Sequence, residues 1–235
     1  MVEIKNFLKD IVKKHHLENE KLRIYIADTR LDTTRIKDYP LMKGKEFLLR
    51  ADFKGFLGDA FTNKLVEFEG KLKDILNMEN PAVIISTLNA VMRYLNLIDK
   101  TVHCQKDEPE KCAKRLVDFL KNLKFNKLGV IGFQPAFVKT LVENFSSDRV
   151  YVTDMNPENI GKTKYGAKIL SEKDNEYLFQ KCDLILATGS SVVNGTFWDI
   201  YDLSKKYKKR VIFYGTSIAG IAKLLNLERF CTFAK

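Results

Sequence analysis

The chain has 235 residues, 45% of them hydrophobic and 30% charged, a balance that excludes a disordered or fibrous protein. Lys and Arg outnumber Asp and Glu by 40 to 30. Residues 1–115 carry +4 and residues 116–235 carry +6 of the net charge of +10. No single basic region marks a polymer-binding surface, so we disfavour a nucleic-acid partner.

No stretch reaches the roughly 18 apolar residues of a membrane span. The first 16 residues have the pattern of an amphipathic helix rather than of a signal peptide. We therefore expect a cytoplasmic protein with no membrane partner. Only three Gln accompany many Lys and Glu, a composition that favours a thermophilic organism.

The first 112 residues have no regular alternation of strands and helices. We expect a helix, two strands and two further helices, over about 3–16, 21–28, 46–53, 65–77 and 81–96. The last helix is mostly apolar and should be buried. This pattern predicts a small α+β domain over 1–112, and the polar stretch 100–114 predicts the connection to a second domain.

The second part, 113–235, alternates short apolar runs with amphipathic helices. The predicted strands are 128–132, 149–154, 167–170, 183–189 and 210–215. The predicted helices are 113–125, 134–145, 172–182, 197–209 and 217–226. Such alternation indicates βαβ units with right-handed crossovers. The overall prediction is an α/β protein, with a Rossmann-like parallel sheet in the C-terminal domain and a smaller α+β N-terminal domain.

In an open parallel sheet, ligands bind beyond the carboxyl ends of the strands. The candidate ligand-binding residues that follow four of the predicted strands are Gly132, Phe133, Asp154, Thr188, Gly189, Ser190, Asn194, Gly195, Thr196, Gly215, Thr216 and Ser217. Two of these loops place Gly with Ser or Thr directly before a helix, which suits a phosphate or carboxylate. A tight turn with a helix cap would explain each loop alone, so the prediction of an anionic small molecule depends on their convergence at one edge.

Asp154 supports a second hypothesis. It lies 22 residues after Gly132 at a strand end, where a Rossmann-fold carboxylate accepts hydrogen bonds from ribose. Phe133 and Pro135 replace a glycine-rich pyrophosphate loop, which disfavours NAD and FAD. S-adenosylmethionine has no pyrophosphate, so a methyltransferase using it, or another nucleoside-binding enzyme, stays open. Asp154 could equally cap the turn at Asn156.

His103, Cys104 and Cys231 are candidate metal ligands, because imidazole and thiolate suit transition metals such as Fe, Ni or Zn. Their spacing is not a C-x-x-C signature. In a reducing compartment the four cysteines should not form disulfides.

Asn89 stands in the apolar helix 81–96, where a buried amide needs a hydrogen-bond partner. It either bonds backbone across the domain junction or closes over a ligand.

Four segments carry a resemblance to a known family: 88–91 (LNAV), 129–133 (GVIGF), 187–196 (ATGSSVVNGT) and 214–217 (YGTS). The chain resembles an archaeal and bacterial family of unknown function, the "putative heavy-metal chelation" family. The resemblance implies an enolase-N-terminal-like domain followed by a Rossmann-like domain. It also implies a ligand site in the interdomain cleft, with Asn89 facing Thr188, Asn194, Thr196 and Thr216.

The combined prediction is a protein that binds an anionic small molecule, a metal or a metal chelate in this cleft, with a role in metal or cofactor metabolism. Whether it catalyses a reaction, and whether it forms a homodimer, both stay open.

Overall fold

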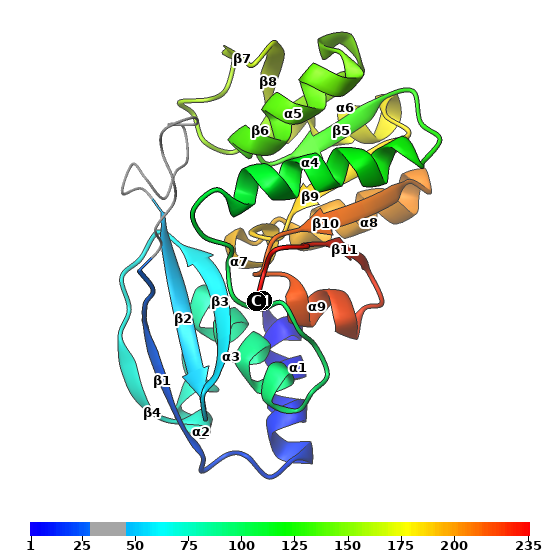
Figure 1. Cartoon of the computed structure of the whole chain (residues 1–235). Helices are drawn as coiled ribbons and strands as arrows, with labels where there is room; N and C mark the ends of the chain where they lie inside the picture. The colour runs from blue at the N-terminus through cyan, green and yellow to red at the C-terminus, as the bar shows by residue number, and fades with distance from the viewer. Residues whose placement is uncertain (29–45) are drawn as a thin grey trace.

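The computed structural model describes residues 1–28 and 46–235 (Figure 1). Two sheets organise these residues, a four-stranded antiparallel sheet and a seven-stranded sheet that is parallel except at one edge. They confirm the predicted fold class, a Rossmann-like C-terminal part with a smaller α+β part before it. None of the helices in the described ranges combines the length and apolar character that a transmembrane segment requires.

The N-terminal part packs helices against one antiparallel sheet with the strand order β3-β2-β1-β4. Its elements are α1 (Val2–Lys14), β1 (Lys21–Ile26), β2 (Phe47–Phe53), β3 (Phe56–Thr62), β4 (Phe68–Lys71), α2 (Leu72–Ile75) and α3 (Pro81–Tyr94). Lys54 and Gly55 both have positive φ, which gives the tight β2–β3 turn the twist that a hairpin needs. Asn80 caps α3 by accepting hydrogen bonds from the first-turn amides.

The predicted helix over 65–77 is wrong in its first half. Residues Phe68–Lys71 form β4, which pairs antiparallel with β1 from Ile24 opposite Phe68 to Lys21 opposite Lys71. The edge of β1 offers ladder hydrogen bonds that satisfy this backbone, and only Leu72–Ile75 is helical. The hairpin strand β3 was not predicted either.

The C-terminal part contains the large sheet, with the strand order β11-β10-β9-β5-β6-β8-β7. Its strands are β5 (Leu128–Ile131), β6 (Val150–Asp154), β7 (Thr163–Lys164), β8 (Ala167–Ser171), β9 (Leu184–Thr188), β10 (Arg210–Tyr214) and β11 (Glu228–Phe230). Its helices are α4 (Glu108–Lys121), α5 (Pro135–Phe145), η2 (Ser147–Arg149), η3 (Glu172–Asp174), α6 (Asn175–Lys181), α7 (Ser191–Asn194), α8 (Phe197–Tyr207) and α9 (Ala219–Leu224). All five predicted strands of this part are present.

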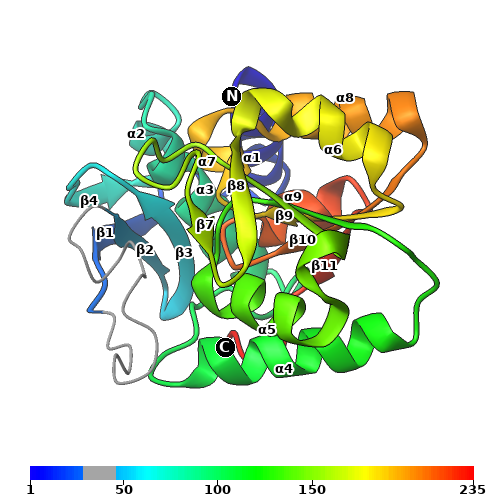
Figure 2. The same cartoon turned by 90° about the horizontal axis from the view of Figure 1, so that it is seen from above.

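The two faces of the large sheet belong to different hydrophobic cores, because successive strand side chains point to opposite faces. Leu184 and Leu186 pack with α4 and α5, whereas Ile185 and Ala187 pack with α6, α8 and α9. Figure 2 shows these two helical layers on either side of the sheet. The core that contains Ile185 and Ala187 continues without interruption through α3 into the N-terminal sheet. The domain boundary at residue 112 stays a prediction; it falls within α4.

Candidate functional site

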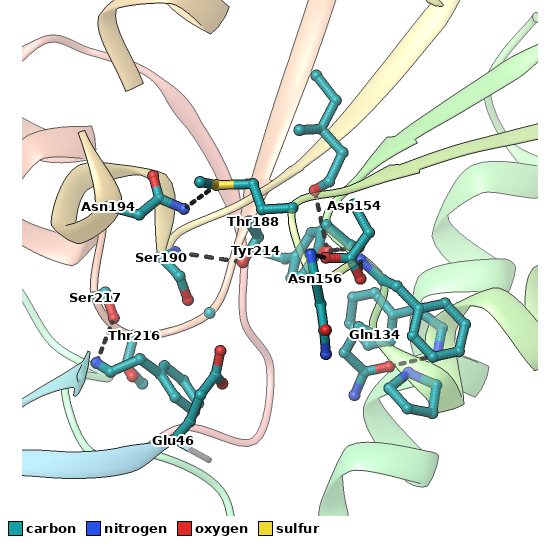
Figure 3. A pocket seen from close by; sticks show the side chains of 18 of the residues that line it. Glu46, Gln134, Asp154, Asn156, Thr188, Ser190, Asn194, Tyr214, Thr216 and Ser217 are labelled. Carbon is teal, nitrogen blue, oxygen red and sulfur yellow. Dashed lines mark hydrogen bonds between the residues drawn. The ribbon is translucent and has the colours of Figure 1, made fainter. Parts of the chain in front are cut away.

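A cavity of about 510 Å³ lies beyond the carboxyl ends of β5, β6, β9 and β10 (Figure 3). β5 is the central strand. The chain continues from β5 to β6 and β8 on one side, and later crosses to β9 and β10 on the other side, so the strand order reverses at β5. Open α/β sheets bind their ligands at such a switch point. Phe61 and Asn63, at the end of β3 and beyond it, close the cavity from the N-terminal sheet. Its volume falls within the range of small-molecule sites.

Most of the ligand-binding residues predicted from the sequence come together in this cavity. Those that line it are Gly132, Phe133, Asp154, Thr188, Ser190, Asn194, Thr196, Gly215, Thr216 and Ser217. Asn89, Gly189 and Gly195 do not line it. The sheet topology explains the convergence, since each of the four loops leaves the same edge.

Asn89 does not line the cavity, and its contact with a ligand stays a prediction. Its side chain is fully buried and its Nδ2 donates to the carbonyl oxygens of Asp59, Thr216 and Ser217 at 3.1–3.2 Å. Its Oδ1 accepts from the amide of Gly220 at 2.8 Å. Every polar atom of the amide is therefore used to fasten α3 to the loop after β10, which is the other role that the sequence left open.

Gly189 and Gly195 serve the backbone rather than the cavity. The amide of Gly189 donates to Tyr214 O at 2.7 Å, and an added Cβ would lie 2.8 Å from that oxygen. Gly195 ends α7 in the left-handed conformation, with φ of 90°. The next residue, Thr196, donates through its amide and its hydroxyl to Asn194 Oδ1.

Asp154 organises the loops on which the nucleoside hypothesis depends. Its Oδ2 accepts from the Phe133 amide at 3.2 Å and from Asn159 Nδ2 at 2.9 Å, and its Oδ1 accepts from the Asn156 amide at 2.9 Å. Three donors thus occupy most of the accepting capacity of the carboxylate. The turn-capping interpretation of Asp154 fits these contacts, and little is left for a ribose hydroxyl.

The start of α5 offers little to an anion. Pro135, the first helical residue, has no amide hydrogen, and Gln134 Oε1 accepts from the Phe137 amide at 2.5 Å. Helix starts bind anions through free amides, and two of these are absent or already bonded here.

The charges that line the cavity are acidic. Glu46, Asp154 and Glu172 line it, and no Lys or Arg of the described ranges does. Burial raises the pKa of Glu46, and the neighbouring charge of Asp154 raises it further. Lys164 lies outside the wall, with its Nζ 4.9 Å from the Phe133 ring centroid. The expected preference for an anionic ligand is therefore not supported by the lining, because a carboxylate surface repels anions.

Thr216 has a buried hydroxyl without a partner in the described part of the chain. The residue is 0% exposed, and its Oγ1 has no hydrogen-bond partner among the described residues. Buried polar atoms are nearly always paired in folded proteins. The solvent-accessible area of Thr216 Oγ1 is below 1 Å², so this hydroxyl lies behind the cavity surface and a ligand in the cavity does not reach it.

The three candidate metal ligands all line the cavity, together with Cys112. In residues 1–28 and 46–235, however, no three His, Cys, Asp or Glu side chains are grouped so that they could hold a metal ion. Burial raises the pKa values of Cys104 and Cys231, which keeps both as neutral thiols, whereas metals bind thiolates. A resident metal site at His103, Cys104 and Cys231 stays a prediction.

Sequence reasoning missed two of the three acidic residues of the cavity and its phenol. Tyr214 ends β10, and its hydroxyl donates to Gly132 O at 2.7 Å; burial raises its pKa, so it stays protonated. Its position at the end of a predicted strand could have identified Tyr214 as a candidate site residue. Glu46 precedes β2 of the other sheet, and Glu172 begins a short helix after β8. Neither residue belongs to one of the four loops that were predicted to bind a ligand.

Comparison with known proteins confirms the resemblance inferred from the sequence. Residues 115–226 match the model of a family described as "Putative heavy-metal chelation". Two solved structures, each described as a protein of unknown function from the DUF364 family, share the fold. One, from Pyrococcus horikoshii, is 19% identical with a TM-score of 0.51 and covers 91% of this chain and 78% of its own. The other, from Desulfitobacterium hafniense, is 13% identical with a TM-score of 0.52 and covers 95% and 83%.

A curated relative, an uncharacterized protein of Methanocaldococcus jannaschii, is 79% identical over 28 residues. This match spans 12% of the chain and 47% of the relative, about half of its length.

Proposed function

We propose that the chain binds a small cationic ligand, a metal ion held in an organic chelate, in the cavity between its two sheets. The observation that carries the proposal is the acidic lining, with Glu46, Asp154 and Glu172 and without a described Lys or Arg. The family description supports a metal as the source of the positive charge. Such binding would serve metal or cofactor metabolism.

A chelate fits the cavity better than a bare ion does. A bare transition metal takes four or more protein or water ligands at close range, and the described residues offer no group of three. A chelate brings most of its own ligands and needs from the protein only charge, shape and a few hydrogen bonds. The volume of about 510 Å³ is many times that of a single ion.

Two exchange-inert cobalt(III) complexes test the charge preference directly. Tris(ethylenediamine)cobalt(III) is cationic and cobalt(III)–EDTA is anionic, and neither exchanges ligands during a measurement. Isothermal titration calorimetry should show binding of the cation and none of the anion. Equal affinity for the two complexes, or a preference for the anion, would refute the proposal.

A matched pair of variants locates the binding. Glu172→Gln removes one cavity charge, and at an effective dielectric constant of about 20 a charge within about 8 Å contributes about 2 kcal/mol. The cation should therefore bind at least tenfold more weakly. Glu79→Gln removes a charge from an exposed residue outside the cavity and should leave the affinity unchanged.

S-adenosylmethionine is the comparison ligand for the methyltransferase alternative. We expect the cobalt cation to bind in its presence without competition. Tight binding of S-adenosylmethionine that is lost in Asp154→Ala would favour the nucleoside hypothesis instead.

A further inference from the structure

His103 lies in the wall of the cavity, in the connection between the two parts of the chain. Its backbone amide donates to Asp59 Oδ2 at 2.8 Å. Asp59 is 0% exposed, and Arg50 binds both of its carboxylate oxygens, at 2.7 and 2.8 Å. A charged pair with two parallel bonds has a fixed geometry. The position of the His103 backbone is therefore set by a rigid anchor in the N-terminal sheet.

The imidazole ring is fixed as well. Its Nδ1 lies 2.6 Å from the carbonyl oxygen of Cys104. Phe61 meets the ring edge-to-face, with 5.2 Å between centroids and 86° between planes. An aromatic contact of this geometry orients the ring about its remaining free torsion.

The contact with Cys104 decides which nitrogen carries the proton. A carbonyl oxygen only accepts, so Nδ1 must hold the hydrogen. In the neutral imidazole, Nε2 is then an unprotonated lone pair. From the described residues, no hydrogen bond reaches Nε2.

We infer that His103 Nε2 coordinates the metal of the bound chelate and is the protein's own ligand to it. This inference rests on the proposed function. Metal-binding histidines commonly donate their other ring N–H to a backbone carbonyl, which holds the tautomer and the ring direction, and the Nδ1 contact with Cys104 has that form. One protein ligand added to those of a chelate also agrees with the lack of a three-residue metal group in the described ranges.

The competing explanation is a histidine buried only for packing. A histidine buried for packing would have both ring nitrogens hydrogen-bonded within the protein, or its ring would lie in a hydrophobic core. His103 instead lines the cavity.

Copper(II) with one ethylenediamine is a suitable probe, because it leaves coordination positions open and is paramagnetic. Electron spin echo envelope modulation detects the remote nitrogen of a coordinated imidazole. The wild type should show one coordinated imidazole. The chain has three histidines, so the variants His15→Gln and His16→Gln should keep the signal, and His103→Gln should lose it and bind the copper complex at least tenfold more weakly.

The inert cobalt(III) cation separates the two proposals. It cannot accept a protein ligand, so it should bind His103→Gln and the wild type within twofold, which also shows that the variant is folded. If the cobalt cation binds and the copper complex shows no imidazole, or keeps its imidazole signal in His103→Gln, the inference on His103 is wrong and the proposed function stands. If neither complex binds, both fail.

Discussion

Replacing Thr216 by Val should stabilise the ligand-free protein. Valine has nearly the shape of threonine, so packing is kept and only the unpaired Oγ1 is removed. Burying a hydroxyl without a partner costs about 1–3 kcal/mol. We therefore expect the free energy of unfolding to rise by about 1–2 kcal/mol. For a chain of this size, each kcal/mol raises the melting temperature by about 2–4 °C.

The same substitution should leave ligand binding unchanged, because Thr216 Oγ1 is buried and is not accessible from the cavity. Urea unfolding of the free protein and calorimetry with tris(ethylenediamine)cobalt(III) measure the two effects separately. Thr87→Val is the matched control, since Thr87 Oγ1 is also buried and unpaired among the described residues but lies in α3, away from the cavity wall. It should give the same gain in stability and no change in affinity. A Thr216→Val protein that is less stable than the wild type would contradict this reasoning.

Three further predictions concern the junction and the cavity charge. Asn89→Ala removes the side-chain hydrogen bonds to four buried backbone groups, of which Thr216 O keeps the amide of Ala219. It should lower the free energy of unfolding by about 3 kcal/mol in urea titrations, and a loss under about 1 kcal/mol would show that these bonds do not fasten α3 to the loop after β10. Gly58→Ala places a Cβ 2.3 Å from the backbone nitrogen of Ala90, whereas at Gly70 the new Cβ meets only the Phe68 ring, so Gly58→Ala should cost more than about 3 kcal/mol and Gly70→Ala much less. The pKa of Glu46 is raised in the folded protein, so its contribution to stability is complete below the unfolded value of 4.5 and is lost as pH rises through the folded pKa. As the pH rises above 4.5, the melting temperature of Glu46→Gln should therefore fall less than that of the wild type. Melting temperatures that change in parallel with pH would show that the pKa of Glu46 is not raised by folding.

Local patterns predicted the large sheet because its strands are short apolar runs whose fate depends little on distant partners. Leu128, Val130 and Leu186 are buried wherever the chain places them in a parallel sheet. The strand β4 could not be predicted in this way, because it forms only by pairing with the edge of β1, about 45 residues earlier in the chain. Short segments with mixed patterns follow tertiary partners rather than their own propensity.

The position of the cavity could be predicted from the sequence, but its charge could not. The rule for parallel sheets brought Thr188 and Thr216 to one edge correctly. The charge of the cavity depends on Glu46, which directly precedes β2 of the other sheet. It also depends on the lysines of the described residues, which are numerous but do not line the cavity. A net charge describes the whole surface, whereas recognition depends on the few side chains that reach the ligand.

The hydrophobic core that passes through α3 has a consequence for how a ligand enters. Because one continuous core holds the N-terminal helices and one face of the large sheet, the two walls of the cavity cannot swing apart without exposing that core to water. Access therefore has to come from side chains and loops at the rim, and the width of the cavity is established when the chain folds. Unfolding should proceed as one cooperative transition of the whole chain, with the same midpoint by far-UV circular dichroism and by tryptophan fluorescence.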